Sequence, residues 1–150
     1  MQVQFIDNKN FIKYKFKTKP YKHQYNAFLK SKDKESYALF MEQGTGKSKV
    51  IIDNIAYLYR EGKIDTAVIA APKGVYRNWL SSEYKTHMPD DVKEFTDMLV
   101  WSPTETKSNI ELLTNFLKPN HNLKFFIINI EALSTDKGKN YLHRLLNSSK

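Results

Sequence analysis

The stretch that decides the fold is YALFMEQGTGKS, residues 37–48. It opens with a continuous apolar run, Tyr37–Met41, of the kind found in buried parallel strands. A glycine-containing turn follows, and apolar residues then recur at helical spacing from Val50 to Leu58. Gly62 is well placed to end that helix. The segment therefore predicts a buried strand, a tight turn and a helix in succession.

The turn carries the residues of a P-loop, Gly44-Thr45-Gly46-Lys47-Ser48. Glycines let backbone N–H groups converge on phosphate oxygens, and the N-terminus of the next helix favours the same negative charge. We expect Lys47 to act as the catalytic lysine that reaches the β- and γ-phosphates of ATP, and Ser48 to offer its hydroxyl to Mg²⁺. The eight-residue pattern has glycine at its first position, where this chain has Met41, so a chance match is the alternative.

Helices and strands are expected to alternate on both sides of this loop. The expected elements are a short helix at Gln24–Leu29, strands at Ala67–Ala71, Met98–Trp101 and Lys124–Ile130, and helices around Trp79–Tyr84, Glu105–Leu117 and Asn140–Leu146. Strands alternating with helices over more than 100 residues predict an α/β fold with a parallel sheet. We expect residues 20–150 to form one incomplete lobe of this kind.

The first nineteen residues have a different pattern. Apolar residues alternate with polar neighbours on both sides of a turn at residues 7–10, which predicts a β-hairpin over residues 1–19. One face of its second strand carries four lysines: Lys13, Lys15, Lys17 and Lys19. We expect Lys13, Lys15 and Lys17 to contact nucleic acid, and a merely solvated basic surface is the alternative.

The composition and net charge indicate which class of partner the chain binds. The net charge is 24 − 16 = +8, and residues 1–30 alone hold seven lysines and one aspartate. Such a cluster suits a polyanion, with DNA as the first expectation and RNA as the alternative. The absence of cysteine excludes disulfides and thiolate metal sites. No apolar run approaches the ~20 residues that cross a bilayer, so a cytoplasmic protein without a membrane partner is expected.

Four motifs in order give the chain a family resemblance over residues 20–147. Residues 37–48 resemble the first motif of superfamily-2 helicases, particularly the Swi/Snf-like translocases, in which a residue other than glycine at the leading position is usual. Pro20-Tyr21-Lys22-His23-Gln24 resembles the Q motif of that family. Ala71-Pro72-Lys73, with Trp79 and Glu83 after it, resembles the next motif, and Phe126–Leu133 resembles a later strand element. The Lys- and Asn-rich composition is typical of AT-rich genomes such as those of bacteria and their phages.

The resemblance implies a P-loop NTPase lobe of the RecA-like kind that binds ATP and Mg²⁺. It implies that Gln24 reads the adenine edge, that Tyr21 packs near the base, and that Lys73 contacts a DNA phosphate. Asn129 stands where relatives commonly have tyrosine, so strand packing is the expectation there. In the family, such a lobe belongs to a helicase or translocase that couples ATP hydrolysis to movement on nucleic acid.

Family members next present an apolar strand ending in Asp-Glu, which this sequence lacks. Its one adjacent acidic pair, Asp90-Asp91, follows Met88-Pro89 in an expected loop. The resemblance therefore implies a first motor lobe truncated before that motif, which hydrolyses ATP feebly or not at all without the remainder of a helicase chain or a partner protein. The alternatives are a natural short binding or inhibitor module, and a small-molecule P-loop kinase. A kinase needs a lid with arginines, and the three arginines of this chain, Arg60, Arg77 and Arg144, are not clustered in sequence.

Overall fold

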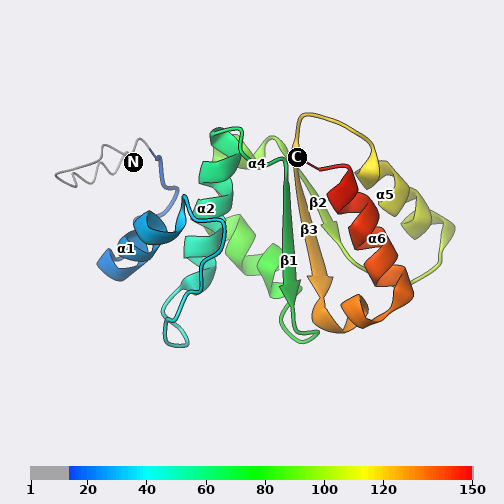
Figure 1. Ribbon diagram of the computed structural model, residues 1–150, viewed down its shortest axis with the longest axis horizontal. Coiled ribbons are helices and arrows are strands. Elements are labelled where there is room, and N and C mark those ends of the chain that lie inside the picture. The colour runs from blue at the N-terminus through cyan, green and yellow to red at the C-terminus, as the bar shows by residue number, and fades with distance from the viewer. Residues whose placement is uncertain (1–13, 150) are drawn as a thin grey trace.

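A three-stranded parallel sheet organises the protein, which is a computed structural model that describes residues 14–149 (Figure 1). The strands are β1 (Thr66–Ala71), β2 (Thr96–Val100) and β3 (Leu123–Asn129), in the order β1-β3-β2. The central strand β3 pairs in parallel with both neighbours. The predicted α/β class with a parallel sheet is confirmed.

Helices precede, connect and follow the strands. They are α1 (Lys22–Ser31), α2 (Lys47–Arg60), the π-helix η1 (Trp79–Tyr84), α3 (Lys85–His87), α4 (Asp90–Lys93), α5 (Lys107–Leu117), the 3₁₀-helix η2 (Ile130–Ser134) and α6 (Asp136–Asn147). The boundaries follow local chemistry: Thr106 and Thr135 accept backbone hydrogen bonds as N-caps of α5 and α6. Gly62 follows α2 with φ of 66°, the left-handed conformation typical of a helix C-terminus.

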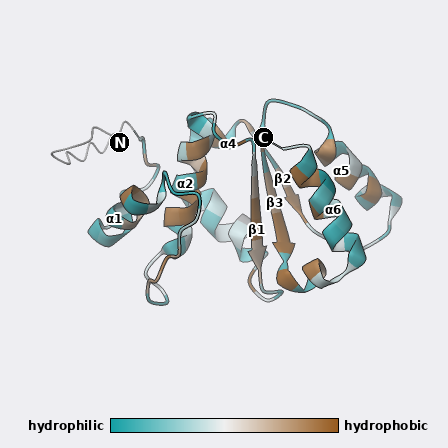
Figure 2. Ribbon diagram, in the orientation of Figure 1, coloured by the Kyte–Doolittle hydropathy of each residue, from teal (hydrophilic) through white to brown (hydrophobic). Residues whose placement is uncertain are grey.

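The two faces of the sheet bury different clusters. On β3, Phe125 and Ile127 pack on the side of α2, whereas Phe126 and Ile128 pack on the side of α5 and α6. This double burial explains why β3 is apolar throughout rather than alternating. Figure 2 shows the hydrophobic colour along β3 and in stretches of α2 and α5.

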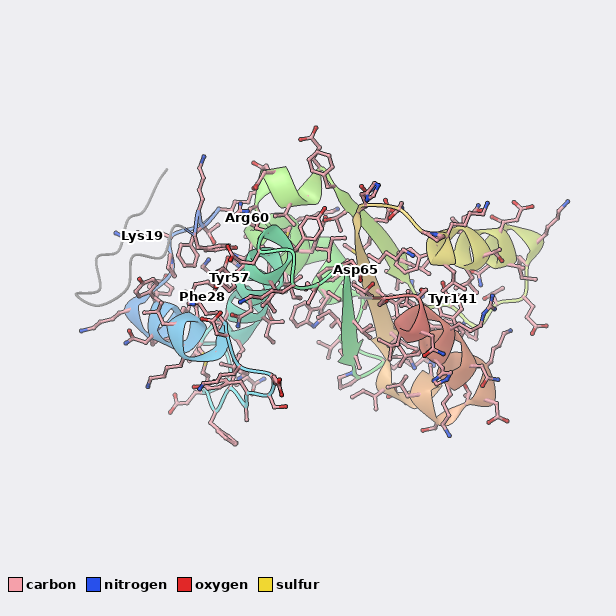
Figure 3. The ribbon with its side chains drawn as sticks, turned by 45° about the horizontal axis from the view of Figure 1, so that its top comes forward. Lys19, Phe28, Tyr57, Arg60, Asp65 and Tyr141 are labelled. Atoms are coloured by element: carbon pink, nitrogen blue, oxygen red, sulfur yellow. The ribbon has the colours of Figure 1, made fainter. Side chains whose placement is uncertain are left out.

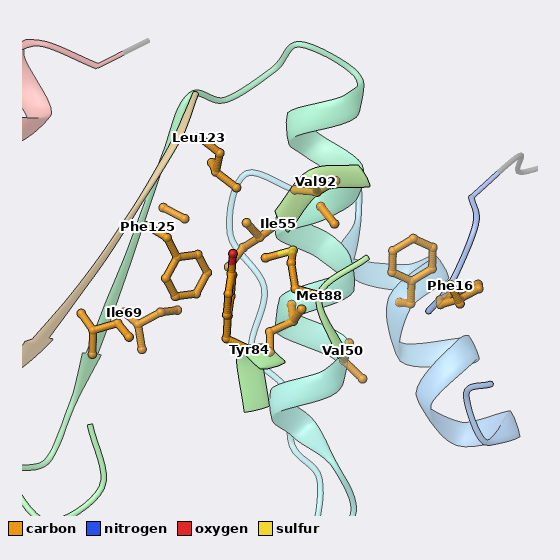
Figure 4. Packing of buried hydrophobic residues seen from close by; sticks show 14 of the residues in the cluster. Phe16, Val50, Ile55, Ile69, Tyr84, Met88, Val92, Leu123 and Phe125 are labelled. Atoms are coloured by element: carbon orange, nitrogen blue, oxygen red, sulfur yellow. The ribbon is translucent and has the colours of Figure 1, made fainter. Parts of the chain in front are cut away.

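A middle layer separates α2 from the sheet. Figure 4 shows Tyr84 facing Phe125 of β3, with Met88 behind it toward α2 and Ile55 of α2 beside them. The rings of Tyr84 and Phe125 are 5.3 Å apart. The helix that follows the P-loop is therefore held to the sheet through η1 and α3, and it contacts η1 directly.

The segment before α1 is anchored to α2 by a buried polar cluster. Tyr14 and Phe16 are both 5% exposed, whereas Lys15 between them is exposed. The Tyr14 hydroxyl donates to Asp53 at 3.0 Å, and Asp53 also pairs with Lys49 at 2.7 Å. Burial raises the pKa of the Tyr14 hydroxyl well above its usual value. Figure 3 shows this junction of α1 and α2 beside Arg60, which lies over the Tyr14 ring.

One expectation about the N-terminal third needs correction, and a second lies largely outside the described residues. Tyr37–Met41 forms no strand, and its Phe40 is 97% exposed. The free edges of the sheet are the outer sides of β1 and β2, and the segment pairs with neither, because it runs beside α2 (Figure 1). The hairpin expected over residues 1–19 falls largely outside the described residues, and its described part, 14–19, contains no strand.

Candidate functional site

The loop before α2 has the backbone geometry of a phosphate cradle. Gly44 and Gly46 have φ values of 76° and 82°, in the left-handed region that only glycine adopts without strain. Gly46 is the N-cap of α2, and no side chain caps this helix end. The first N–H groups of a helix have no partners within it, so this end can receive an anion. The predicted P-loop residues therefore lie at an uncapped helix end, and their binding of phosphate stays a prediction.

Lys47 is held by the loop itself. Its Nζ donates to the carbonyl of Met41 at 2.8 Å and to that of Glu42 at 3.0 Å. The Thr45 hydroxyl donates to the same Glu42 carbonyl at 2.6 Å. These acceptors are neutral, and a phosphate would offer the ammonium charged oxygens in their place, which form stronger hydrogen bonds.

Gln24 connects α1 to the P-loop. Its Oε1 accepts from the backbone N–H of Tyr21 at 2.9 Å, and its Nε2 donates to the carbonyl of Thr45 at 3.3 Å. Gln24 is 5% exposed, and a Cβ at Gly46 would overlap its side-chain nitrogen. Both ends of the amide are thus engaged within the chain, so its predicted reading of adenine stays a prediction that requires the amide to turn away from these partners.

His23 is a site residue that sequence reasoning missed. Its Nε2 lies 2.9 Å from the carbonyl of Thr45, which can only accept, so Nε2 carries the proton. The exposed ring of Tyr21 stacks on His23 with centroids 5.9 Å apart and planes 11° apart. The two rings form an aromatic surface tied to the P-loop. The only available signal was the position of His23 next to Gln24.

Whether the loop can hold ATP with Mg²⁺ depends on the groups that it offers to the phosphates and to the metal ion. Ser48, the predicted Mg²⁺ ligand, lies in the first turn of α2 and is half-buried. Asp53, one turn further along, is occupied by Lys49 and Tyr14. Within residues 14–149 no group of three or more His, Cys, Asp or Glu side chains could hold a metal ion. The cradle therefore fits a phosphate, and any Mg²⁺ would depend on Ser48 and the phosphates themselves.

The predicted nucleic-acid residues are not brought together. Lys17 pairs with Asp90 of α4 at 2.9 Å, near the ends where β1 and β3 begin (Figure 1). Lys15 is exposed on the same segment, and Lys13 lies outside the described residues. Asp91 pairs with Arg60. The Asp90-Asp91 pair is thus engaged in ion pairs at the opposite end of α2 from the P-loop.

Lys73 lies at the other end, where β1 and β3 finish. It is exposed and directly follows Pro72 after β1. Its backbone N–H donates to Glu131 at 3.4 Å, and Asn129 donates to the other oxygen of the same carboxylate at 3.1 Å. Asn129 ends β3 in register with Ala71. In open α/β sheets this carboxyl end of the strands is where ligands bind.

Comparison with known proteins gives one match. A family described as type III restriction enzyme, res subunit, matches residues 2–150. Neither curated proteins nor solved structures gave a match. In the described part of the chain, no helix has both the length and the apolar character needed to cross a membrane.

Proposed function

Because this chain belongs to the type III restriction enzyme res subunit family, a family of helicase-like ATPases, we propose that it is the nucleotide-binding part of a motor that uses ATP to move on DNA. The observation that carries the proposal is the uncapped N-terminus of α2 behind Gly44 and Gly46, with Lys47 reaching back over the loop. As part of the same proposal, the chain belongs to a Swi/Snf-like branch. The motor then moves along the nucleic acid rather than only separating its strands.

Lys47, Ser48 and the backbone at the start of α2 have separate roles in the proposed binding of ATP. The backbone N–H groups at the start of α2 receive phosphate oxygens, and Lys47 exchanges the carbonyls of Met41 and Glu42 for the β- and γ-phosphates. Ser48 offers its hydroxyl to Mg²⁺, which neutralises charge on the phosphates. The rings of Tyr21 and His23 provide an apolar surface for the base beside the loop.

DNA binding is assigned to the carboxyl end of the sheet. Lys73 is exposed there, and the chain carries a net charge of +8. A lysine beside backbone N–H groups binds a strand phosphate without reading sequence, and it releases counterions on doing so. Lys15 and Lys17 stay a predicted second contact at the end of the sheet where β1 and β3 begin, and the contact predicted for Lys13 lies outside the described residues. RNA is the alternative partner.

Hydrolysis by this chain alone is expected to be feeble. The adjacent acidic pair, Asp90-Asp91, is bound to Lys17 and Arg60 away from the P-loop. Arg77 contacts Tyr76, and Arg144 lies on α6, so neither joins Arg60. Phosphoryl transfer depends on positioned charge, and an arginine finger is worth roughly 10³–10⁵ in rate. Turnover therefore requires groups from another lobe or a partner protein.

The test is calorimetric binding of a non-hydrolysable ATP analogue with Mg²⁺. Lys47→Ala should weaken binding by at least about tenfold, the equivalent of one lost charge-assisted interaction, while the circular dichroism spectrum stays unchanged. Lys139→Ala, which removes an exposed lysine of α6, is the matched control and should bind as the wild type does. Equal affinity of Lys47→Ala and wild type would refute the proposal.

A binding module that does not use ATP is the second candidate. It is favoured by the way the chain already satisfies Lys47 and Gln24 with its own carbonyls. Salt-sensitive DNA binding that is the same with and without ATP, and the same in Lys47→Ala, would support this candidate over the first.

A further inference from the structure

The ends of β1 and β3 bring an acidic side chain onto the surface where a nucleic-acid strand is proposed to bind. Ala71 and Asn129 are paired in register, so the residues after them are neighbours although they are far apart in sequence. Lys73 follows β1 by two residues, and Glu131 follows β3 by two. Both lie at the carboxyl edge of the sheet, on the same side as the P-loop (Figure 1).

The carboxylate of Glu131 bridges the two strand ends. One oxygen accepts from the backbone N–H of Lys73 at 3.4 Å, and the other accepts from the Asn129 amide at 3.1 Å. Hydrogen bonds from its own backbone N–H and from Asn129 lower the pKa of Glu131 below its usual value. The group is therefore an anion at neutral pH, held by donors from both strands.

These donors are the ones that a strand phosphate would use. A backbone N–H after a strand and a nearby amide position phosphates in nucleic-acid complexes, and a carboxylate accepts from the same groups. Two anions cannot share one set of donors, since each repels the other and both need the same hydrogen atoms. From this overlap we propose that Glu131 is an internal competitor that occupies the phosphate position at the end of β1 and weakens nucleic-acid binding there.

The competitor can be displaced. The Glu131 side chain is exposed, so it can swing into solvent without leaving an unsatisfied buried charge. Its departure frees the Lys73 N–H and the Asn129 amide beside the Lys73 ammonium, which makes no ion pair within residues 14–149. The affinity of this site for a nucleic-acid strand is thus set by the exchange of the Glu131 carboxylate for a strand phosphate. The inference rests on the proposed function, because it concerns the same nucleic-acid contact.

The test compares two substitutions that remove one negative charge each. Glu131→Gln keeps the shape of the side chain but removes the competing anion. Glu94→Gln changes an exposed glutamate just after α4, at the opposite end of the sheet, and controls for net charge. Binding of a fluorescent single-stranded oligodeoxynucleotide is measured by anisotropy at one fixed salt concentration. Glu131→Gln should bind roughly three- to tenfold tighter than wild type, and Glu94→Gln less than about twofold tighter.

The outcomes separate the inference from the function on which it rests. If wild type and Glu94→Gln bind and Glu131→Gln gains no more than the control, the competitor role is refuted and the nucleic-acid proposal stands. If none of the three binds even at low salt, both fall together. The amide resonance of Lys73 gives an independent measurement: it should move in Glu131→Gln without oligonucleotide, and in wild type on saturation with it. A resonance that moves in neither case would also overturn the inference.

Discussion

Gln24 and Gly46 are fitted to one another, since a Cβ on the glycine would overlap the side-chain nitrogen of the glutamine. The same glycine has φ of 82°, so two separate constraints favour glycine there. Gly44 meets only the conformational constraint, because space around it is open. The pairing of Gln24 with Gly46 therefore makes α1 part of the P-loop structure.

The two P-loop glycines should differ in their tolerance of alanine. Gly44→Ala should cost about 1–2 kcal/mol, the strain of a left-handed alanine. Gly46→Ala should cost more, because Gln24 must also move away from its partners on the loop. Urea unfolding of both variants measures the difference. Equal losses would show that the contact between Gln24 and Gly46 is not tight in solution.

Substitution of Gln24 should reveal whether it holds the loop or reads the base. Gln24→Ala removes the bonds to the Tyr21 N–H and the Thr45 carbonyl. If the amide acts through the loop, this variant should weaken ATP and inorganic tripolyphosphate by similar factors, roughly three- to tenfold for one or two hydrogen bonds. Calorimetry with both ligands provides the comparison. A loss confined to ATP would instead support the reading of adenine.

The buried pair of Lys49 and Asp53 should dominate the stability of the N-terminal half. The two side chains are 3% and 2% exposed and 2.7 Å apart. Asp53→Ala leaves Lys49 as an uncompensated buried charge, which costs about 3–5 kcal/mol. Chemical denaturation followed by circular dichroism measures this loss. The double variant Lys49→Met with Asp53→Leu should recover most of it, and failure to recover would show that Asp53 acts mainly through Tyr14.

Acidification should weaken the protein through His87. Burial, and then the charges of Lys49 and Lys17, lower the pKa of His87 below its ordinary value of 6.5, although Glu83 lies 3.8 Å from its Nε2. The unfolded chain then binds a proton that the folded chain does not, so stability is full above about pH 6.5 and falls as the pH drops through the folded pKa.

Comparison of urea midpoints at about pH 7.5 and 5.5 tests this prediction. His87→Gln should show a smaller loss than wild type over this interval, and His143→Gln on α6, which removes an exposed histidine, serves as the control. The prediction is wrong if His87→Gln and wild type lose stability equally.

The sequence predicted those parts of the fold that depend on local chemistry. The apolar spacing after Lys47, the left-handed Gly62 and the apolar runs of β1 and β3 correspond to elements within a few residues of the expected positions. The prediction of a strand at Tyr37–Met41 was wrong because an apolar run indicates only a tendency to be buried. Whether it becomes a strand depends on a free sheet edge beside it, and that is decided by how β1, β2 and β3 are arranged.

The sequence predicted the loop of the candidate site, but it did not predict the contacts that join this site and the Lys73 surface to distant parts of the chain. The P-loop residues form one short segment, so their pattern survives in sequence. The contacts of His23 with Thr45 and of Glu131 with Lys73 join residues 22 and 58 positions apart. No spacing rule links such positions, because the register of β1 with β3 and the docking of α1 on α2 create them.

The outer edge of β1 makes this strand a natural reporter in hydrogen exchange. β1 pairs only with β3 among the described residues, and it has neither proline nor charge between Thr66 and Ala71. Alternate amides along a strand point to opposite sides, so half of those in β1 face β3 and half face outward. Exchange in deuterated water should therefore divide β1 into slow and fast amides in strict alternation. Slower exchange of the outward-facing amides would show, residue by residue, that another strand has paired with this edge of β1.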